Sequence, residues 1–184
     1  GLYADKLAHK FGIGLEYSIV PFRGEYFEVN APVNSMVYQA PDLRYPFLGV
    51  HFTKSINGKV LAGPSAVLSL GRESYKKEID FSETFDMMGS SNFWKMVMSR
   101  EFLSLAAHNA KMSLSKRAFL GEINSLLKNP VGDGDVKPYK AGIRAQLVDR
   151  GGKMVSDFIV DYRANSTHVL NAVSPGMTSS LVFA

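Results

Sequence analysis

The residue in this sequence with the clearest chemical potential is Arg144, which lies in an extended stretch, Pro138 to Gln146. Side chains alternate between the two faces of a strand, so Arg144 shares a face with Gly142. The glycine leaves space beside the guanidinium, where backbone or a bound molecule can approach. The guanidinium fork matches a carboxylate bidentately. Two interpretations stay open: Arg144 binds a carboxylate ligand, or it pairs with one of the chain's 17 acidic residues as a structural ion pair.

His51 is a second candidate, because an imidazole titrates near neutral pH and can act as a general base. It lies in the apolar stretch Phe47 to Thr53, which is followed by an Asn-Gly turn within Ile56 to Gly58 and a second apolar run. Asn-Gly between two such runs predicts a β-hairpin, with His51 near the middle of its first strand. A core histidine with satisfied ring nitrogens is the alternative interpretation.

The third candidate is the segment Ser174 to Ser180, where small and hydroxyl residues precede an apolar run. We predict a loop that enters a helix. Free backbone N–H groups and the positive end of a helix suit an anion or an electron-rich carbonyl. The alternative is that Ser174, Thr178 and Ser179 only cap the helix.

Other chemistries are excluded by their missing patterns. The four histidines are far apart in the sequence: His9, His51, His108 and His168. Asp133 and Asp135 resemble the start of a calcium loop, but no glutamate closes it, so we expect no metal site. Gly12 and Gly14 are not a dinucleotide fingerprint, because Tyr17 occupies the third glycine's place and a strand follows. There is no Gly-x-Ser-x-Gly motif, and the absence of cysteine excludes disulfides and thiolate catalysis.

Composition indicates one globular domain, which we place at residues 1–184. Hydrophobic residues make up 46% and charged residues 21% of the chain, and the net charge is +4 without a basic run. We therefore expect no nucleic-acid partner, while an anionic small molecule or an acidic membrane surface stays open. No apolar run approaches the about 20 residues of a membrane-spanning helix. The chain lacks an initial Met and ends on an apolar run, which we interpret as a fragment.

Hydrophobic spacing predicts the helices and strands that would position these groups. Expected helices cover Tyr3 to Phe11, a stripe from Trp94 to Leu105, and Leu114 to Leu127 with Ser113 as N-cap; Arg72 to Lys77 is helix-compatible. Expected strands are Tyr17 to Val29 with a break, an edge position or a bulge at Pro21, Ser35 to Ala40, the hairpin, the Arg144 strand, Phe158 to Tyr162 and His168 to Ala172. Without strict strand–helix alternation, this order favours an α+β fold whose mainly antiparallel or mixed sheet is flanked by helices.

A series of short motifs along the chain resembles one enzyme family. In order they are Gly1-Leu-Tyr-Ala-Asp5, Pro21-Phe-Arg-Gly-Glu-Tyr26, Pro46 to Thr53, Gly63-Pro-Ser-Ala-Val67, Ser113 to Arg117, Ala141-Gly-Ile-Arg-Ala-Gln146, and His168 to Leu181. Together they resemble the FAD-dependent L-2-hydroxyglutarate oxidases and dehydrogenases of the D-amino-acid oxidase (glycine oxidase-like) superfamily. The resemblance spans nearly the whole chain.

The resemblance implies that residues 1–184 are the substrate-binding domain, without the N-terminal Rossmann fingerprint for FAD, and that 164–184 returns toward the flavin. It implies oxidation of L-2-hydroxyglutarate, or a related small 2-hydroxy acid, to the 2-oxo acid by hydride transfer to FAD, with oxygen or a membrane quinone as the final acceptor. The expected location is cytoplasmic, with a peripheral contact at the inner membrane. The fragment by itself is expected to be inactive. An amino-acid or glycine oxidase and a non-catalytic carboxylate-binding domain are the alternatives.

Residue roles follow from the same resemblance. Arg144 matches the arginine that clamps the substrate carboxylate, and His51 matches a histidine that could take the hydroxyl proton. Arg23 and Lys116 are candidates for a second carboxylate. The cofactor-binding residues implied by the C-terminal loop are Ser174, Gly176, Thr178, Ser179 and Ser180.

Overall fold

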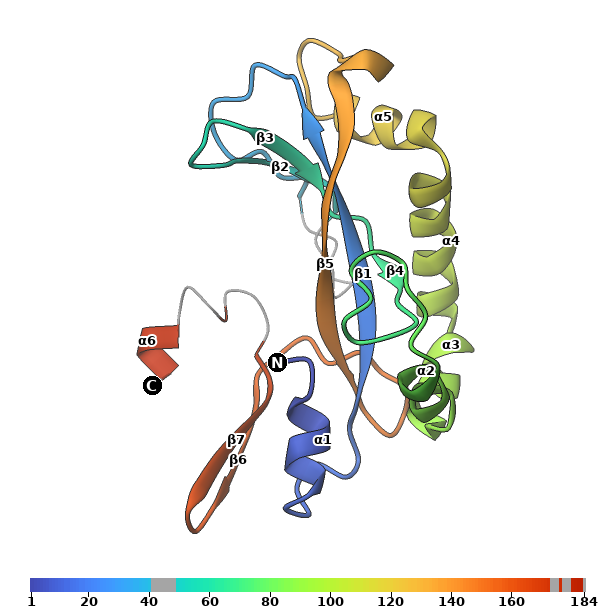
Figure 1. Ribbon diagram of the computed structural model, residues 1–184, viewed down its shortest axis with the longest axis vertical. Coiled ribbons are helices and arrows are strands. Elements are labelled where there is room, and N and C mark those ends of the chain that lie inside the picture. Colours follow the sequence, from blue (N-terminus) through green and yellow to red (C-terminus); the bar gives the residue numbers. More distant parts are fainter. Residues whose placement is uncertain (41–48, 173–175, 177–179, 184) are drawn as a thin grey trace.

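A computed structural model describes residues 1–40, 49–172, 176 and 180–183 of the chain (Figure 1). The strands are β1 (Ser18–Val29), β2 (His51–Lys54), β3 (Val60–Gly63), β4 (Val67–Leu68), β5 (Val136–Val148), β6 (Ile159–Arg163) and β7 (Ser166–Asn171). The helices are α1 (Ala4–His9), α2 (Phe81–Met88), α3 (Ser91–Val97), α4 (Arg100–Leu114), α5 (Lys116–Asn124) and α6 (Ser180–Phe183), with a 3₁₀ turn at Asp133–Asp135.

Two long strands, β1 and β5, form the centre of the molecule (Figure 1). They pair antiparallel over almost their whole length, with Gly24 opposite Gly142. The other edge of β1 pairs with β4 near its middle and with β3 near its end, and β3 pairs with β2. All of these pairs are antiparallel. The α+β fold with a mainly antiparallel sheet is therefore confirmed.

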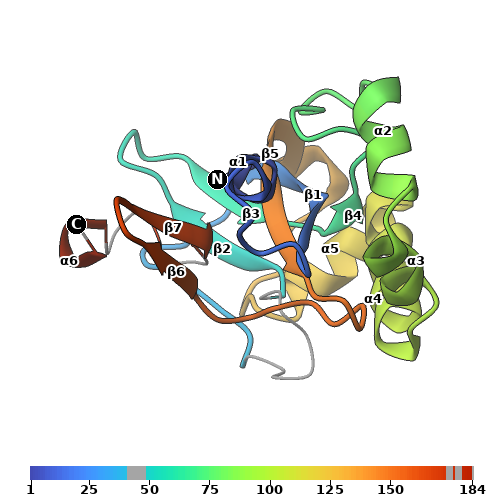
Figure 2. The same ribbon diagram turned by 90° about the horizontal axis from the view of Figure 1, so that it is seen from below.

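Helices α2 to α5 cover one side of this sheet (Figures 1 and 2). They contribute to two hydrophobic clusters. One cluster contains Val20, Phe22, Met87, Phe93, Met96, Phe102 and Val148. The other joins the β2–β3 hairpin to α5 through residues that include Phe52, Ala62, Phe119 and Ile123. Both clusters hold the helices against the strands.

Helix α1 is attached to the rest of the chain by a buried ion pair between Asp5 and Arg72, which are 3% and 7% exposed. The guanidinium donates to both carboxylate oxygens, and Asp5 also accepts from the backbone N–H of Ile19 at 2.8 Å. Burial by itself would raise the pKa of Asp5, but the Arg72 and Ile19 hydrogen bonds outweigh it and hold the pKa below its usual value. Asp5 is therefore a structural anion.

Of the alternatives at Pro21, a break in the strand and a bulge at this position are wrong. β1 is continuous, and its irregularity lies between Glu25 and Phe27 instead. The carbonyl of Pro21 accepts from the N–H of Ser69, just beyond the end of β4 at Leu68. The backbone N and O of a strand residue point to the same edge, so the nitrogen of Pro21 also faces the segment that contains Ser69. That segment lies beyond the end of β4, so no strand there needs the N–H that proline lacks.

Two short predicted elements are wrong. Ser35 to Ala40 is not a strand, because only Val37 forms a bridge, to Phe52 of β2. Arg72 to Lys77 consists of turns and bends rather than helix. Arg72 is instead fixed by its pairing with Asp5, a long-range interaction that overrides local helix preference.

The predicted helix from Trp94 to Leu105 is two helices, α3 and α4. The second begins because the side chain of Ser99 accepts a hydrogen bond from the N–H of Phe102 as its N-cap. The break turns Trp94 and Met98 outward, to 44% and 69% exposure, although the stripe predicted both as core. Phe93 and Met96 occupy the core in their place.

The N-cap of α5 is Ser115, whose side chain accepts from Ala118, and not Ser113 as the sequence predicted. Ser113 lies inside α4, and its hydroxyl donates to Glu25 at 2.6 Å. The helix ends at Asn124, earlier than expected, and α2 was not predicted at all. These differences leave the sheet and its cavity side unchanged.

Candidate functional site

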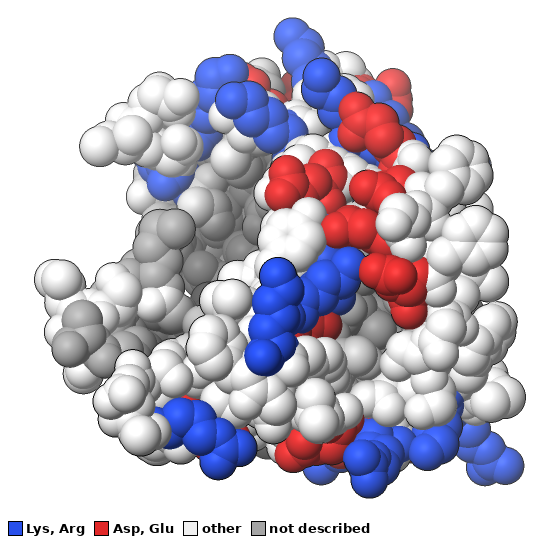
Figure 3. Space-filling model, turned by 60° about the horizontal axis from the view of Figure 1, so that its bottom comes forward, with Lys and Arg blue, Asp and Glu red and all other residues white. Residues whose placement is uncertain are grey.

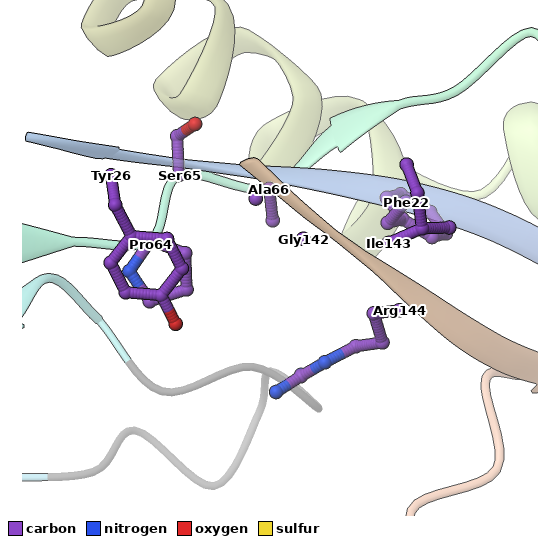
Figure 4. Close-up of a pocket in the computed structure, with 9 residues that line it drawn as sticks. Phe22, Tyr26, Pro64, Ser65, Ala66, Gly142, Ile143 and Arg144 are labelled. Atoms are coloured by element: carbon purple, nitrogen blue, oxygen red, sulfur yellow. The ribbon is translucent and has the colours of Figure 1, made fainter. Parts of the chain in front are cut away.

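A cavity of about 170 Å³ lies beside the middle of the β1–β5 ribbon (Figure 4). The described residues that line it are Phe22, Gly24, Tyr26, Pro64, Ser65, Ala66, Gly142, Ile143 and Arg144. They come from β1, from the segment joining β3 to β4, and from β5. Most of these described residues are apolar, a few are polar and none is acidic. That composition suits a small anionic ligand.

The floor of this cavity is formed by two glycines that face each other across the strands, Gly24 and Gly142. A Cβ placed on Gly142 would meet no atom within 4 Å, so the space above this residue is open. A Cβ placed on Gly24 would lie 2.7 Å from the Cβ of Pro64, so that glycine is required by packing. The sequence predicted open space beside Arg144, and the structure confirms it at Gly142.

Arg144 lies on the same strand as Gly142, two residues further along, and is half-buried against the cavity (Figure 4). Burial lowers the pKa of its guanidinium, while the nearby phenol of Tyr26 acts in the opposite direction. An arginine keeps its positive charge despite such a shift. Gln146 does not join it at the cavity: its buried amide donates to the carbonyls of Leu147 and Val155.

His51 is the first residue of β2, rather than a residue near the middle of a strand. It pairs with Gly63, the residue before Pro64 of the cavity wall, but it is not among the described lining residues itself. Its ring stacks on Tyr38 with centroids 4.6 Å apart, and its Nδ1 lies 3.1 Å from the carbonyl oxygen of Gly49. His51 is therefore adjacent to the cavity wall, and β3 lies between its strand and the β1–β5 ribbon.

Arg23 lies on the opposite face of β1 from Gly24 and Tyr26, as strand alternation requires. Its Nη1 donates to Glu25 Oε1 at 2.7 Å, and its Nε donates to the carbonyl of Tyr75. Glu25 also accepts from Ser113 of α4 and pairs with Lys77 at 3.1 Å. Arg23, Glu25, Lys77 and Ser113 thus form a polar cluster on the helix side of the sheet, which we call the helix-side cluster.

Burial would raise the pKa of Glu25, but the hydrogen bond from Ser113 and the charge of Lys77 outweigh it and lower the pKa. The carboxylate is therefore ionised and neutralises cations of its own cluster. Lys116, the first residue of α5, pairs with Asp133 at 3.0 Å. Neither Arg23 nor Lys116 is among the described residues of the Arg144 cavity. Their role toward a second carboxylate is a prediction to which the cavity lends no support.

Ser174, Thr178 and Ser179 lie outside the described residues. Gly176 is a half-buried turn residue, and Ser180 is the exposed first residue of α6. The return of residues 164–184 toward a flavin, and the cofactor contacts assigned to this segment, stay predictions.

The residue that sequence reasoning missed is Tyr26, which lies two positions after Gly24 on the cavity face of β1. Figure 4 shows its hydroxyl and the Arg144 guanidinium extending to the same side of the ribbon. Burial raises the pKa of Tyr26, and the charges of Arg144 and Tyr38 act on it in opposite directions. Two signals in the sequence could have identified it: strand alternation from Gly24, and its place at the end of the motif Pro21 to Tyr26.

Other surfaces and clusters carry less chemistry. Among the described residues, no three His, Asp or Glu side chains come together in a way that could hold a metal ion. Within the same residues, no helix has the length and apolar character needed to cross a membrane. In Figure 3 most acidic side chains gather to the right of the centre, basic side chains lie beside them and at the top and bottom, and the right edge is largely uncharged.

The chain is similar in sequence to known flavoenzymes. Residues 1–184 match the family model described as DAO, FAD dependent oxidoreductase. The chain is 39% identical over 98% of its length to an L-2-hydroxyglutarate dehydrogenase of Indibacter alkaliphilus, of which it covers 46%. It is 38% identical over 98% of its length to the L-2-hydroxyglutarate dehydrogenase of Escherichia coli K12, covering 43%. The human mitochondrial L-2-hydroxyglutarate dehydrogenase is 36% identical over 98% of the chain and is covered to 41%. The chain thus spans less than half the length of these relatives.

Proposed function

Because this chain belongs to the DAO family of FAD dependent oxidoreductases, we propose that it forms the substrate-binding part of an enzyme that oxidises L-2-hydroxyglutarate or a closely related 2-hydroxy acid. The names of its relatives support this substrate. Residues 1–184 form a single substrate-binding domain in this proposal, and 164–184 return toward the flavin, with Ser174, Gly176, Thr178, Ser179 and Ser180 beside it.

The observation that carries the proposal is the placement of Arg144 beside the open floor at Gly142. Arg144 binds the carboxylate of the 2-hydroxy acid, because its fork can donate two parallel hydrogen bonds to the two oxygens. Its half-burial strengthens this ion pair, since the cavity is less polar than water. The carboxylate fixed in this way orients the neighbouring C2 hydroxyl group.

The described residues fit the reacting end of FAD better than its nucleotide end. The open space above Gly142 can admit a flat ring, which a side chain at this position would obstruct. A complete nucleotide cradle is not encoded in this sequence, so another segment holds most of the cofactor. When bound, FAD supplies the acceptor for the hydride that leaves C2.

His51 takes the proton of the C2 hydroxyl in this proposal. The carbonyl of Gly49 can only accept a hydrogen bond, so its 3.1 Å contact assigns the ring proton to Nδ1. The lone pair is then on Nε2, the atom that can accept a proton. The stacked ring of Tyr38 holds the imidazole plane.

The proposal is tested with the full-length protein loaded with FAD. Under anaerobic conditions, L-2-hydroxyglutarate should bleach the visible absorbance of the flavin, while glycine should leave it unchanged. Bleaching by glycine instead would support the amine-oxidising alternative. A full-length protein that stays colourless with added FAD would support a non-catalytic carboxylate-binding domain. The 184-residue chain by itself should show no turnover.

We also propose a cytoplasmic enzyme in peripheral contact with a membrane, where a quinone accepts the electrons, with oxygen as the alternative acceptor. The net charge of +4 is compatible with attraction to an acidic membrane surface. Turnover of the full-length enzyme with a soluble quinone, compared with turnover in air alone, separates the two acceptors. Sedimentation with anionic vesicles tests the contact.

A further inference from the structure

The proposed substrate carries two carboxylates, and Arg144 accounts for one of them. Arg23 and Lys116, the cations considered for the second, are paired with Glu25 and Asp133 outside the described cavity lining. The second carboxylate therefore needs a different donor, and that donor has to reach the same cavity as Arg144.

Tyr26 is placed where such a donor is needed. Gly24 and Gly142 face each other in the cavity floor, and Arg144 lies two residues beyond Gly142 along β5. Because β1 runs antiparallel to β5, Tyr26, two residues beyond Gly24, lies past the opposite end of the glycine pair. Four strand residues correspond to about 13 Å between the backbone positions, and both side chains extend over the floor (Figure 4). A ligand lying across the two glycines would meet Arg144 at one end and Tyr26 at the other.

The protonation state of Tyr26 suits this role. Burial raises the pKa of the phenol, so near neutral pH it is protonated and its O–H can donate. The other described hydroxyl in the lining, that of Ser65, accepts from the N–H of Glu25 at 3.2 Å. Figure 4 shows that hydroxyl pointing away from Arg144.

We infer that Tyr26 donates a hydrogen bond to the second carboxylate of the substrate and so makes the site selective for dicarboxylates. This inference rests on the proposed function and deepens it. A cation for one end and a neutral donor for the other would recognise a short chain with a carboxylate at each end. A hydroxy acid that ends in a methyl group would leave the Tyr26 hydroxyl without its ligand partner.

The test measures equilibrium binding to the FAD-loaded full-length protein, by the change in flavin absorbance as a non-reacting acid is added. Glutarate and valerate each have five carbons, and they differ in whether the far end is a carboxylate or a methyl group. We expect the unsubstituted protein to prefer glutarate. Tyr26→Phe should lower that preference about 10- to 100-fold, because a hydrogen bond to a charged group contributes about 1.5–3 kcal/mol. Valerate affinity should stay constant.

Tyr139→Phe is the matched control, because Tyr139 lies on β5, is 38% exposed and is not among the described lining residues. Tyr26→His keeps a planar donor and should retain part of the glutarate preference. Equal losses for glutarate and valerate, or no loss for either, would overturn the inference. The bleaching experiment is separate: if L-2-hydroxyglutarate fails to bleach the unsubstituted protein, the proposed function fails, whatever Tyr26→Phe does to binding.

Discussion

The two faces of β1 carry similar residues in opposite situations. On the cavity face, Gly24 and Tyr26 line the same cavity as Arg144 of β5. On the other face, Arg23 and Glu25 belong to the helix-side cluster, where the carboxylate already has three partners. The ribbon thus has two arginines in different surroundings. Arg144 of β5 lies beside the cavity, and Arg23 of β1 is ion-paired in the helix-side cluster.

Successive residues of β1 therefore have different roles. One faces the cavity and can affect ligand binding, and the next faces the helix-side cluster and affects stability. The cavity face has glycines where side chains would fill the floor, and the helix-side cluster has partners for its charges. Substitutions of Arg144, Tyr26 or Gly142 should therefore change substrate binding with little effect on folding, whereas Gly24 is also fixed by its packing against Pro64. Substitutions in the helix-side cluster should do the reverse.

The largest expected effect is that of Arg144→Met in the full-length enzyme. Removing one partner of a desolvated charge pair costs about 2–5 kcal/mol, so kcat/KM should fall about a hundredfold or more. Arg144→Lys should retain part of the activity, because lysine keeps the charge but not the bidentate fork. Steady-state kinetics and thermal melts measure both variants. An unchanged kcat/KM would remove Arg144 from the site.

Gly142→Val should impair substrate binding while leaving the stability of the fold unchanged. The added side chain meets no described atom near its Cβ, and valine favours a strand, so folding should be maintained. Its methyl groups would occupy the cavity floor, and kcat/KM should fall at least about tenfold. Gly24→Ala is the contrasting variant, because its Cβ would lie 2.7 Å from Pro64 and should lower the melting temperature. Full activity in Gly142→Val would show that the floor is not used.

Glu25→Gln tests the helix-side cluster. The amide cannot neutralise Arg23 and Lys77, so the free energy of unfolding should fall by about 1–3 kcal/mol. The value of kcat/KM should stay within about twofold, because Glu25 points away from the cavity. Urea denaturation and kinetics on the same preparation measure the two quantities. A large activity loss without a stability loss would contradict the division between the faces.

The smallest expected effect is on the pH dependence of stability. The pKa of Glu25 is lowered from 4.5 in the folded protein, so its contribution is complete above this ordinary value. That contribution is lost as the pH falls below 4.5 and through the folded pKa, because protonation then favours the unfolded chain. Glu25→Gln should therefore flatten the acid limb of a plot of unfolding free energy against pH, since the amide does not titrate. Asp5 titrates in the same direction in both proteins and serves as the internal reference.

Local pattern was sufficient to place the two long strands and to put Arg144 on one of them beside a glycine. Alternation in β5 and a glycine two residues before Arg144 predict a charged side chain beside open space, and both are present. The hairpin followed equally well from Asn-Gly, since Gly58 adopts the positive φ that this turn requires.

The remaining features depend on contacts that local pattern does not contain. Arg23 is held by its own strand and by Ser113 through Glu25, a contact across 88 positions of sequence. No spacing rule connects residues that far apart, so Arg23 could not be assigned to the helix side from its neighbours. The split between α3 and α4 depends on one serine cap that the apolar stripe concealed. Tyr26 ends the motif Pro21 to Tyr26, but only the register of β1 against β5 shows its relation to Arg144.

The Asp5–Arg72 pair has a consequence for local opening of the fold. It links α1 to the turns after β4 across 67 positions of sequence, and both side chains are almost fully enclosed. If either segment detached alone, the other would retain a buried charge without its counter-ion, which costs about 3–5 kcal/mol. These two segments should therefore open together, as one cooperative unit in native-state hydrogen exchange. Amides in the first turn of α1 and near Arg72 would then exchange with the same free energy of opening.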